Sequence, residues 1–205
     1  MRCGLWFFDR PLEIALEAFL ISTSAIALGE LGDKTQLLAF VLAAKYKRPV
    51  PIVLGILAAT LLNHTAAAAL GEWIGAMLGP DVLRWAIGLS FLGMAVWVLI
   101  PDRIEDEAAT AAPRFGVFGT TLITFFLAEM GDKTQIATVA LGARFHELLP
   151  VVAGTTLGMM IADVPAVFMG SKVARALPMK LVHSVAAAIF AILGALTLLK
   201  VGPQL

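Results

Sequence analysis

Two short charged blocks recur in a chain that is otherwise strongly apolar. The first block, at residues 29–36, reads GELGDKTQ, and the second, at residues 128–135, reads AEMGDKTQ. Each block supplies two carboxylates, and carboxylate oxygens are ligands that hard divalent cations such as Ca²⁺, Mg²⁺ and Mn²⁺ prefer in proteins. The sequence therefore predicts a cation site whose ligands are Glu30, Asp33, Glu129 and Asp132.

The remaining polar residues of the two blocks are expected to support this site. Neutral oxygens are offered by hydroxyl and amide side chains, namely Thr35, Gln36, Thr134 and Gln135. Lys34 and Lys133 add positive charge, so four acids and two lysines leave a formal net charge of −2 (2 − 4). One divalent cation or two protons would neutralise that charge, which predicts the exchange of a divalent cation for protons.

Helical spacing predicts how the acids meet. On a continuous helix, Glu30, Asp33 and Lys34 are spaced i, i+3 and i+4 and share one face, and the second block has the same spacing, so the four carboxylates are expected to converge on one cavity. The same residues also allow a purely structural alternative. An ion pair between the glutamate and the lysine of each block would then simply hold helices together. It would leave both aspartates unpaired and would not explain the recurrence, so we favour the cation site. Gly32 and Gly131 weaken the helix between the acids, so each helix is expected to bend or break there.

The composition places these blocks in a membrane protein. Hydrophobic residues make up 60% of the 205 residues, charged residues only 15%, and the mean hydropathy is +0.90. A soluble domain carries about 25% charged residues, so we predict an all-α integral membrane protein in contact with the lipid bilayer. The formal net charge is zero, which gives no indication of nucleic-acid binding. The single cysteine excludes an internal disulfide and a thiolate metal cluster.

Six apolar stretches are predicted to cross the hydrocarbon core, which takes about 20 residues per crossing. They lie near residues 12–44, 50–71, 82–100, 115–143, 149–170 and 181–200. The first and the fourth stretch are longer than one crossing needs, and each contains a charged block in its interior. Charged groups at this depth are costly unless they pair, protonate, bind a cation or face water.

The blocks belong to a repeat that runs through the whole chain. Glu129 follows Glu30 by 99 residues (129 − 30). The same offset relates Phe19 to Phe118, Pro51 to Pro150, Gly55 to Gly154, Gly71 to Gly170 and Phe91 to Phe190. Three crossings per half is an odd number, so the second half enters from the opposite side and the repeat is inverted. We therefore predict two three-helix repeats, 1–101 and 115–205, joined by an acidic linker at 102–114. In transporters built this way the site lies near the midplane between the repeats.

A second polar layer lies in the second and fifth stretches. His64 and Asp163 are also 99 residues apart (163 − 64). Polar residues inside membrane crossings are functional candidates by default. Asp163 is expected to act as a further ligand or a proton relay, and the imidazole of His64 belongs to the side-chain type that ordinarily changes charge near neutral pH. The alternative is that both side chains only hydrogen-bond a neighbouring helix.

The distribution of basic residues predicts the orientation. Eight basic residues fall in the loops of one side, against five on the other. The first group comprises Lys45, Lys47, Arg48, Arg103, Arg114, Lys172, Arg175 and Lys180, and the second Arg2, Arg10, Arg84, Arg144 and Lys200. Cytoplasmic loops carry the excess of Lys and Arg, so both termini are expected outside and the linker in the cytoplasm. The first apolar stretch has a partner in the second half, so we interpret it as part of the fold and not as a signal peptide.

Two copies of Glu-x-Gly-Asp-Lys-Thr with an acidic linker between them resemble the Golgi-type manganese/calcium cation/proton exchanger family. The resemblance extends over about residues 12–200, and the short linker resembles the bacterial manganese exporters of that family. It implies Mn²⁺ or Ca²⁺ as transported substrate, protons as coupling ion, no permanently bound cofactor, and a location in the bacterial inner membrane. The motif residues that carry over are Glu30, Gly32, Asp33, Lys34 and Thr35, and Glu129, Gly131, Asp132, Lys133 and Thr134.

Other function classes remain as alternatives at this point. An exporter of a small cationic solute such as an amino acid would use the acids to bind an ammonium group. An intramembrane enzyme needs a paired nucleophile and base or a histidine-rich zinc site, which the scattered His64, His146 and His183 do not supply. A scaffold predicts that substitution of Asp33 is tolerated. The choice between Mn²⁺ and Ca²⁺, the coupling ion, the stoichiometry and a homo-oligomeric state are left open by the sequence.

Overall fold

The computed structural model describes residues 6–100, 115–169 and 179–200, and the regular elements in these ranges are all helices. They are α1 (Trp6–Glu30), α2 (Lys34–Tyr46), α3 (Pro49–Met77), α4 (Pro80–Trp97), α6 (Gly116–Glu129), α7 (Lys133–Phe145), α8 (Leu148–Met169) and α10 (Met179–Leu198). The predicted all-α class is thereby confirmed. The predicted acidic linker, 102–114, lies outside the described residues, as do Arg2, Arg103, Arg114, Lys172 and Arg175 of the orientation argument.

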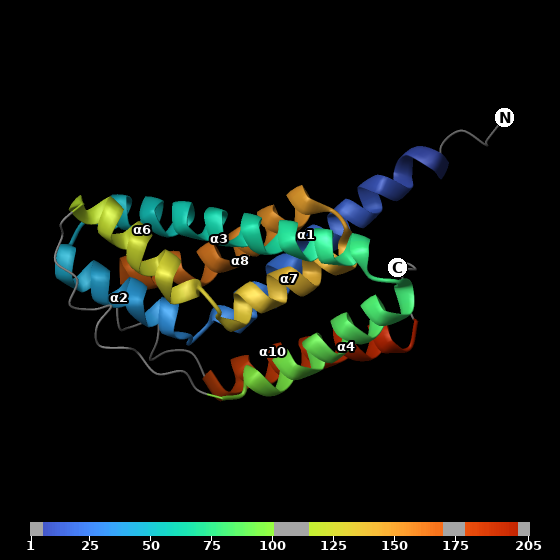
Figure 1. Ribbon diagram of the computed structural model, residues 1–205. Helices are drawn as coiled ribbons and strands as arrows, with labels where there is room; N and C mark the ends of the chain where they lie inside the picture. The colour runs from blue at the N-terminus through green and yellow to red at the C-terminus, as the bar shows by residue number, and fades with distance from the viewer. Residues whose placement is uncertain (1–5, 101–114, 170–178, 201–205) are drawn as a thin grey trace.

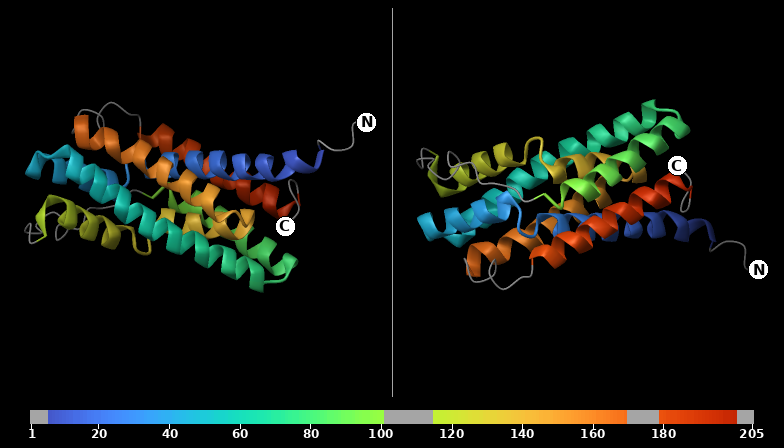
Figure 2. Two further views of the ribbon diagram at one scale, coloured as in Figure 1. Left: turned by 90° about the horizontal axis from the view of Figure 1, so that it is seen from above. Right: turned by 90° about the horizontal axis from the view of Figure 1, so that it is seen from below.

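The helices form one elongated bundle in which corresponding helices of the two halves run in opposite directions (Figure 1). The pair α1–α2 runs along the bundle from its N-terminal end, and the pair α6–α7 runs back the other way. The same antiparallel relation holds between α3 and α8 and between α4 and α10, as the views from above and below also show (Figure 2). As a result, α1 begins and α10 ends at the same end of the bundle.

The structure confirms that both charged blocks interrupt a helix. Gly32 has a φ of 86° and Gly131 a φ of 74°, in the left-handed region that glycine enters without steric cost. The residue that follows, Asp33 or Asp132, has an extended backbone and precedes the next helix. The expectation that the block residues share one face of a continuous helix is therefore wrong. A tight turn through the glycine separates the glutamate, which ends one helix, from the aspartate, which precedes the next.

The predicted crossings correspond to single helices or to interrupted pairs. Four helical segments are long and apolar enough to cross a membrane, Leu12–Glu30, Pro49–Met77, Leu148–Phe168 and Lys180–Leu198. Gly116–Glu129 is a shorter apolar helix. The stretch predicted at 82–100 is found as the 18-residue helix α4, which ends at Trp97. The two long stretches are the pairs α1–α2 and α6–α7, each divided at its glycine.

Matching contacts pack the motif-bearing helices against the long helix of the other half. Gly55 of α3 lies against Thr121 of α6, and Gly154 of α8 lies against Ser22 of α1. These two contacts are related by the repeat, because 154 − 55 and 121 − 22 both equal 99. Glycine lets two helix backbones approach closely, as is common between helices in membranes. The long helix of each half therefore packs closely against the first motif-bearing helix of the other half.

Candidate cation-binding site

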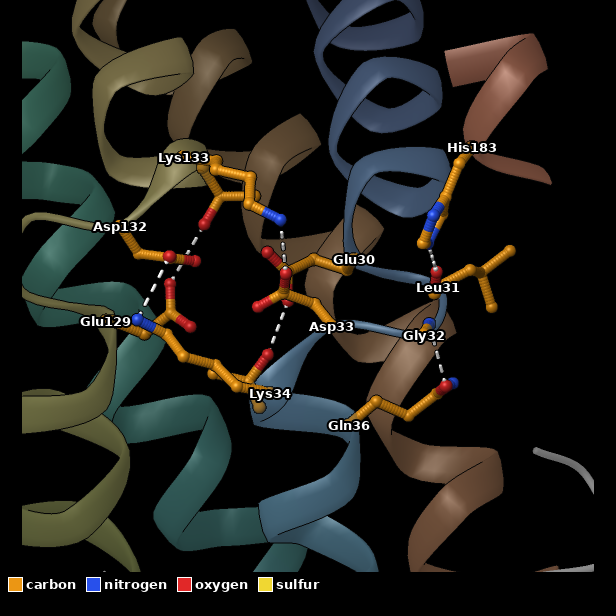
Figure 3. A network of polar contacts seen from close by, with 12 residues as sticks. Glu30, Leu31, Gly32, Asp33, Lys34, Gln36, Glu129, Asp132, Lys133 and His183 are labelled. Carbon is orange, nitrogen blue, oxygen red and sulfur yellow. Dashed lines mark hydrogen bonds and ion pairs between the residues drawn. The ribbon is translucent and has the colours of Figure 1, made fainter. Parts of the chain in front are cut away.

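The two helix breaks lie in the middle part of the bundle (Figure 1), and the close view shows that they bring the charged blocks together (Figure 3). Glu30 ends α1 and Glu129 ends α6, and both side chains are completely buried. Asp33 and Asp132 directly precede α2 and α7 and are also buried. The structure thus gathers all four predicted acids into one enclosed region.

The lysines form ion pairs that connect the two halves. Lys34 Nζ lies 3.0 Å from Asp132 Oδ1, and Lys133 Nζ lies 2.9 Å from Asp33 Oδ1. Each lysine therefore pairs with the aspartate of the other block, in place of the glutamate of its own block that the structural alternative assumed, and both aspartates have an ion-pair partner. Because the helix is interrupted after the glutamate, the lysine no longer lies one turn beyond it and extends towards the facing block.

The two ion pairs differ in their surroundings. The side chain of Lys133 is 5% exposed, whereas that of Lys34 is 29% exposed. Lys133 is therefore enclosed together with Asp33, while Lys34 reaches the surface of the bundle. The two ion pairs are related by the repeat but differ in solvent exposure. The stability of the protein is therefore expected to respond differently when one partner of either pair is removed.

The threonines of the blocks hold the glutamates. Thr35 Oγ1 donates to Glu30 Oε2 over 2.6 Å, and Thr134 Oγ1 donates to Glu129 Oε2 over 3.0 Å. In both glutamates the other oxygen, Oε1, is buried and has no hydrogen-bond partner among the described residues. A buried polar atom without a partner is costly. Each glutamate therefore has one fixed oxygen and one oxygen available for a cation or a proton.

The glutamines stabilise the helix breaks. Gln36 Oε1 accepts the N–H of Gly32 over 2.9 Å, and Gln135 Oε1 accepts the N–H of Gly131 over 2.7 Å. Gln36 Nε2 also donates to the carbonyl of Ala162 in α8 over 2.9 Å. These amide oxygens, expected as neutral ligands, satisfy backbone groups that the interruption releases from the helix.

The carboxylates lie at distances suited to a metal ion. One oxygen each from Glu30, Asp33 and Asp132 lies within 4.8 Å of the others. Oxygen ligands bind Ca²⁺ at about 2.3–2.6 Å, so two ligand oxygens on one Ca²⁺ ion can be separated by up to about twice this length. Glu129 is not part of this group of three, but it interacts electrostatically with Asp132.

The second polar layer is buried next to this region. Asp163 on α8 and His64 on α3 are completely buried, and none of their side-chain oxygens or nitrogens has a hydrogen-bond partner in the described part of the chain. The alternative that both side chains only hydrogen-bond a neighbouring helix therefore finds no support there. Asp163 interacts electrostatically with Glu30 and Glu129, which makes it a fifth acid of the region.

One contact at the first break was not anticipated from the sequence. His183 on α10 places its Nε2 3.0 Å from the carbonyl oxygen of Leu31 (Figure 3). In the sequence this histidine is only one of three scattered histidines, because it follows Leu31 by 152 residues and lies outside both blocks. No sequence pattern indicates this contact, because it arises from the packing of α10 beside the end of α1.

A comparison with protein families finds a match that covers most of the chain. Residues 18–106 and 117–204 match the family described as the divalent cation/proton antiporter GDT1. The matched segments correspond to the two halves of the repeat, and each contains one charged block.

Several curated proteins are similar to this chain over most of its length. A protein of Vibrio cholerae, provisionally described as a manganese exporter, is 45% identical over 188 residues, which covers 91% of this chain and 93% of that protein. A GDT1-like protein of Synechocystis is 33% identical over 198 residues, covering 85% and 93% respectively. GDT1-like protein 3 of rice is 26% identical over 200 residues, covering 85% and 71%. No solved structure matches the chain.

Proposed function

Since this chain belongs to the GDT1 family of divalent cation/proton antiporters, we propose that it exports Mn²⁺ and that Mn²⁺ binds between the two helix breaks. The family match confirms the resemblance inferred from the doubled motif. The protein is therefore a cation/proton antiporter and not an enzyme. Export of Mn²⁺ is supported by the description of the Vibrio cholerae relative as a manganese exporter. The buried oxygen cluster suits Ca²⁺ as well, so Ca²⁺ is the second substrate to test.

The observation that carries this proposal is the close group formed by Glu30, Asp33 and Asp132. Glu129 completes the proposed ligand set, since its unpartnered Oε1 is buried in the same region. All of these ligands are carboxylate oxygens, which suit Mn²⁺, Ca²⁺ and Mg²⁺. A cationic amino acid would need a wider cavity than a group of oxygens within 4.8 Å of one another, so the metal is favoured.

The architecture that supports this function is an inverted repeat with six crossings. We propose that the interrupted pairs α1–α2 and α6–α7 each make one crossing, so that the repeats 1–101 and 115–205 have three crossings each. The antiparallel course of corresponding helices supports this assignment. Both termini are then proposed to lie outside a bacterial inner membrane, with the linker 102–114 in the cytoplasm, because the side of the linker carries eight basic residues against five.

Exchange follows from the charge of the site. The four acids and two lysines sum to −2, and an empty charged site is costly inside a bilayer. Binding of one Mn²⁺ or of two protons removes this charge, so the loaded forms change between inward- and outward-facing states more readily than the empty form. Asp163 and His64 are proposed to accept protons on their way to the motif acids, since both are buried without hydrogen-bond partners in the described residues.

Transport into proteoliposomes tests this function directly. Purified protein is reconstituted, a pH gradient is imposed, and uptake of Mn²⁺, Ca²⁺ and Mg²⁺ is followed together with lumenal pH. The proposal expects Mn²⁺ movement driven by the pH gradient and a proton flux in the opposite direction. Mn²⁺ movement that ignores both a pH gradient and a Na⁺ gradient would contradict coupled exchange, and transport of lysine or arginine in place of metal would favour the cationic-solute alternative.

A further inference from the structure

The first helix break is held by a side chain from outside both motifs. The break leaves the carbonyl of Leu31 beyond the regular hydrogen bonds of α1, and His183 Nε2 lies 3.0 Å from this oxygen. A carbonyl oxygen only accepts hydrogen bonds, so the ring must carry its proton on Nε2 and donate it. The His183 side chain is half-buried, between α10 and the end of α1 (Figure 3).

Apolar packing holds α10 against the same part of α1. Leu28, in the last turn of α1, packs against a small cluster formed by Val98 with Ala186 and Ala187, the two alanines lying about one turn beyond His183 on α10. α10 also packs along α4, where the rings of Phe91 and Phe190 stack with centroids 6.3 Å apart. The hydrogen bond to Leu31 therefore connects the break to a packed pair of helices and not to a loop.

The first half has a different residue at the position that corresponds to His183. The position 99 residues before His183 is Arg84. Its guanidinium instead pairs with Asp81 on its own helix over 3.3 Å and lies over the ring of Trp85. Met130, the counterpart of Leu31, is exposed, whereas Leu31 is half-buried. The contact to His183 is thus a specific feature of the first break.

The contact matters for the cation site because Leu31 lies between two of its proposed ligands in the chain. Leu31 directly follows Glu30 and precedes Asp33 by two residues, and both acids belong to the close group of three carboxylates. The backbone at Gly32 has little intrinsic rigidity, because glycine has no side chain to restrict it. A hydrogen bond to the carbonyl next to Gly32 therefore restricts the separation of the two carboxylates.

We infer that His183 is a positioning residue that fixes the carboxylates of the first motif, through the Leu31 carbonyl, at the spacing that the transported cation requires. The inference rests on the proposed function, because it assumes that Glu30 and Asp33 bind that cation. His183 thus acts through the Leu31 carbonyl and is not itself assigned as a ligand of the cation. Its loss is expected to weaken cation binding on the side of α1 and to leave the second motif intact.

The test compares substitutions at position 183 in the reconstituted full-length protein. His183→Leu removes the donor, and His183→Gln keeps an N–H at a similar reach. We expect the leucine variant to raise the apparent KM for Mn²⁺ by about 3- to 10-fold, the range that one lost hydrogen bond produces, with the maximal rate changed less than about 2-fold. The glutamine variant should restore most of the affinity. Arg84→Gln, at the corresponding position of the other half, is the matched control and should leave KM unchanged.

A double-mutant cycle separates positioning from general destabilisation. His183→Leu is combined with Thr35→Val, which frees Glu30 in the first motif, or with Thr134→Val, which frees Glu129 in the second. If His183 acts through the first motif, its effect on KM is non-additive with Thr35→Val and additive with Thr134→Val. His183→Ala replaces the leucine variant if that protein does not fold.

The possible outcomes distinguish this inference from the function on which it rests. If the unmodified protein does not exchange Mn²⁺ for protons, the proposed function is wrong. If it does, and the donor-less variants at position 183 keep the original KM, or couple equally to both threonines, the positioning role of His183 is refuted while the proposed function stands.

Discussion

Replacement of Asp33 by asparagine is predicted to stop Mn²⁺ exchange and to destabilise the protein more than the equivalent change in the second motif. Asp33 Oδ1 lies 2.9 Å from Lys133 Nζ, and these side chains are 2% and 5% exposed. Removing one partner of a buried ion pair costs about 3–5 kcal/mol, because the other charge remains buried. Asp132→Asn should cost less, since its partner Lys34 is 29% exposed and can reorient its flexible side chain.

The assay measures thermal unfolding in detergent and Mn²⁺ uptake into proteoliposomes for both variants. We expect a clearly larger loss of melting temperature for Asp33→Asn than for Asp132→Asn, and loss of uptake in both. Equal losses of melting temperature would refute the conclusion that the two ion pairs differ in burial. Uptake at the original rate in either variant would refute the assignment of that aspartate as a ligand.

A double substitution then separates the charge of the site from its ligands. Asp33→Asn reduces the formal charge to −1 (three acids and two lysines), and adding Lys133→Met returns it to −2 (three acids and one lysine). Replacing a buried ion pair by uncharged residues is often neutral or stabilising, so the double variant should regain stability. It should not regain transport, because an oxygen of the close carboxylate group is still missing. Recovered transport would mean that net charge alone matters; Lys133→Met alone is the control.

Further predictions concern the threonine, the glycine, the second layer and pH. Thr35→Val removes the 2.6 Å hydrogen bond to Glu30 and should raise the KM for Mn²⁺ by about 3- to 10-fold, whereas Thr35→Ser should not, as uptake kinetics will show. Gly131→Ala should destabilise by about 1–2 kcal/mol in thermal unfolding, because φ is 74° there and the added Cβ would meet no atom within 4 Å, so only the backbone conformation is penalised. Asp163→Asn should uncouple Mn²⁺ movement from proton flux, measured with a lumenal pH dye, and unchanged coupling would exclude it as a proton acceptor. Protons and Mn²⁺ compete for the same oxygens, so acidifying the cytoplasmic side should weaken apparent Mn²⁺ affinity there, while acidifying the outside should accelerate export; an affinity independent of cytoplasmic pH would contradict the competition.

Much of this arrangement could be predicted from local sequence patterns. A glycine placed between two acids inside a long apolar stretch indicates an interrupted helix, and the structure places positive φ angles at Gly32 and Gly131. The constant offset between Glu30 and Glu129 indicates a repeat, and the corresponding helices run in opposite directions. The helix breaks and the repeat depend on residue type and on spacing along the chain, so both can be predicted from the sequence.

The pairing of side chains depends on how the helices pack in three dimensions, which the spacing of residues along the chain does not reveal. The sequence suggests a contact between Glu30 and Lys34, one helical turn apart, but the helix is interrupted at Gly32 and Lys34 pairs with Asp132 of the other half. In the same way, Gln36 binds the released N–H of Gly32 and is not left free for a cation. The contact between His183 and Leu31 depends on how α10 packs beside α1, and no local pattern indicates it.

The most direct test of the central claim is the position of Mn²⁺ itself. A structure of the protein with bound Mn²⁺, with anomalous scattering recorded at the manganese absorption edge, would locate the ion independently of transport. The account predicts an anomalous peak between the two helix breaks, within about 2.0–2.6 Å of carboxylate oxygens of Glu30, Asp33 and Asp132. A peak at any other position, with the four motif acids still held only by their lysines and threonines, would contradict it.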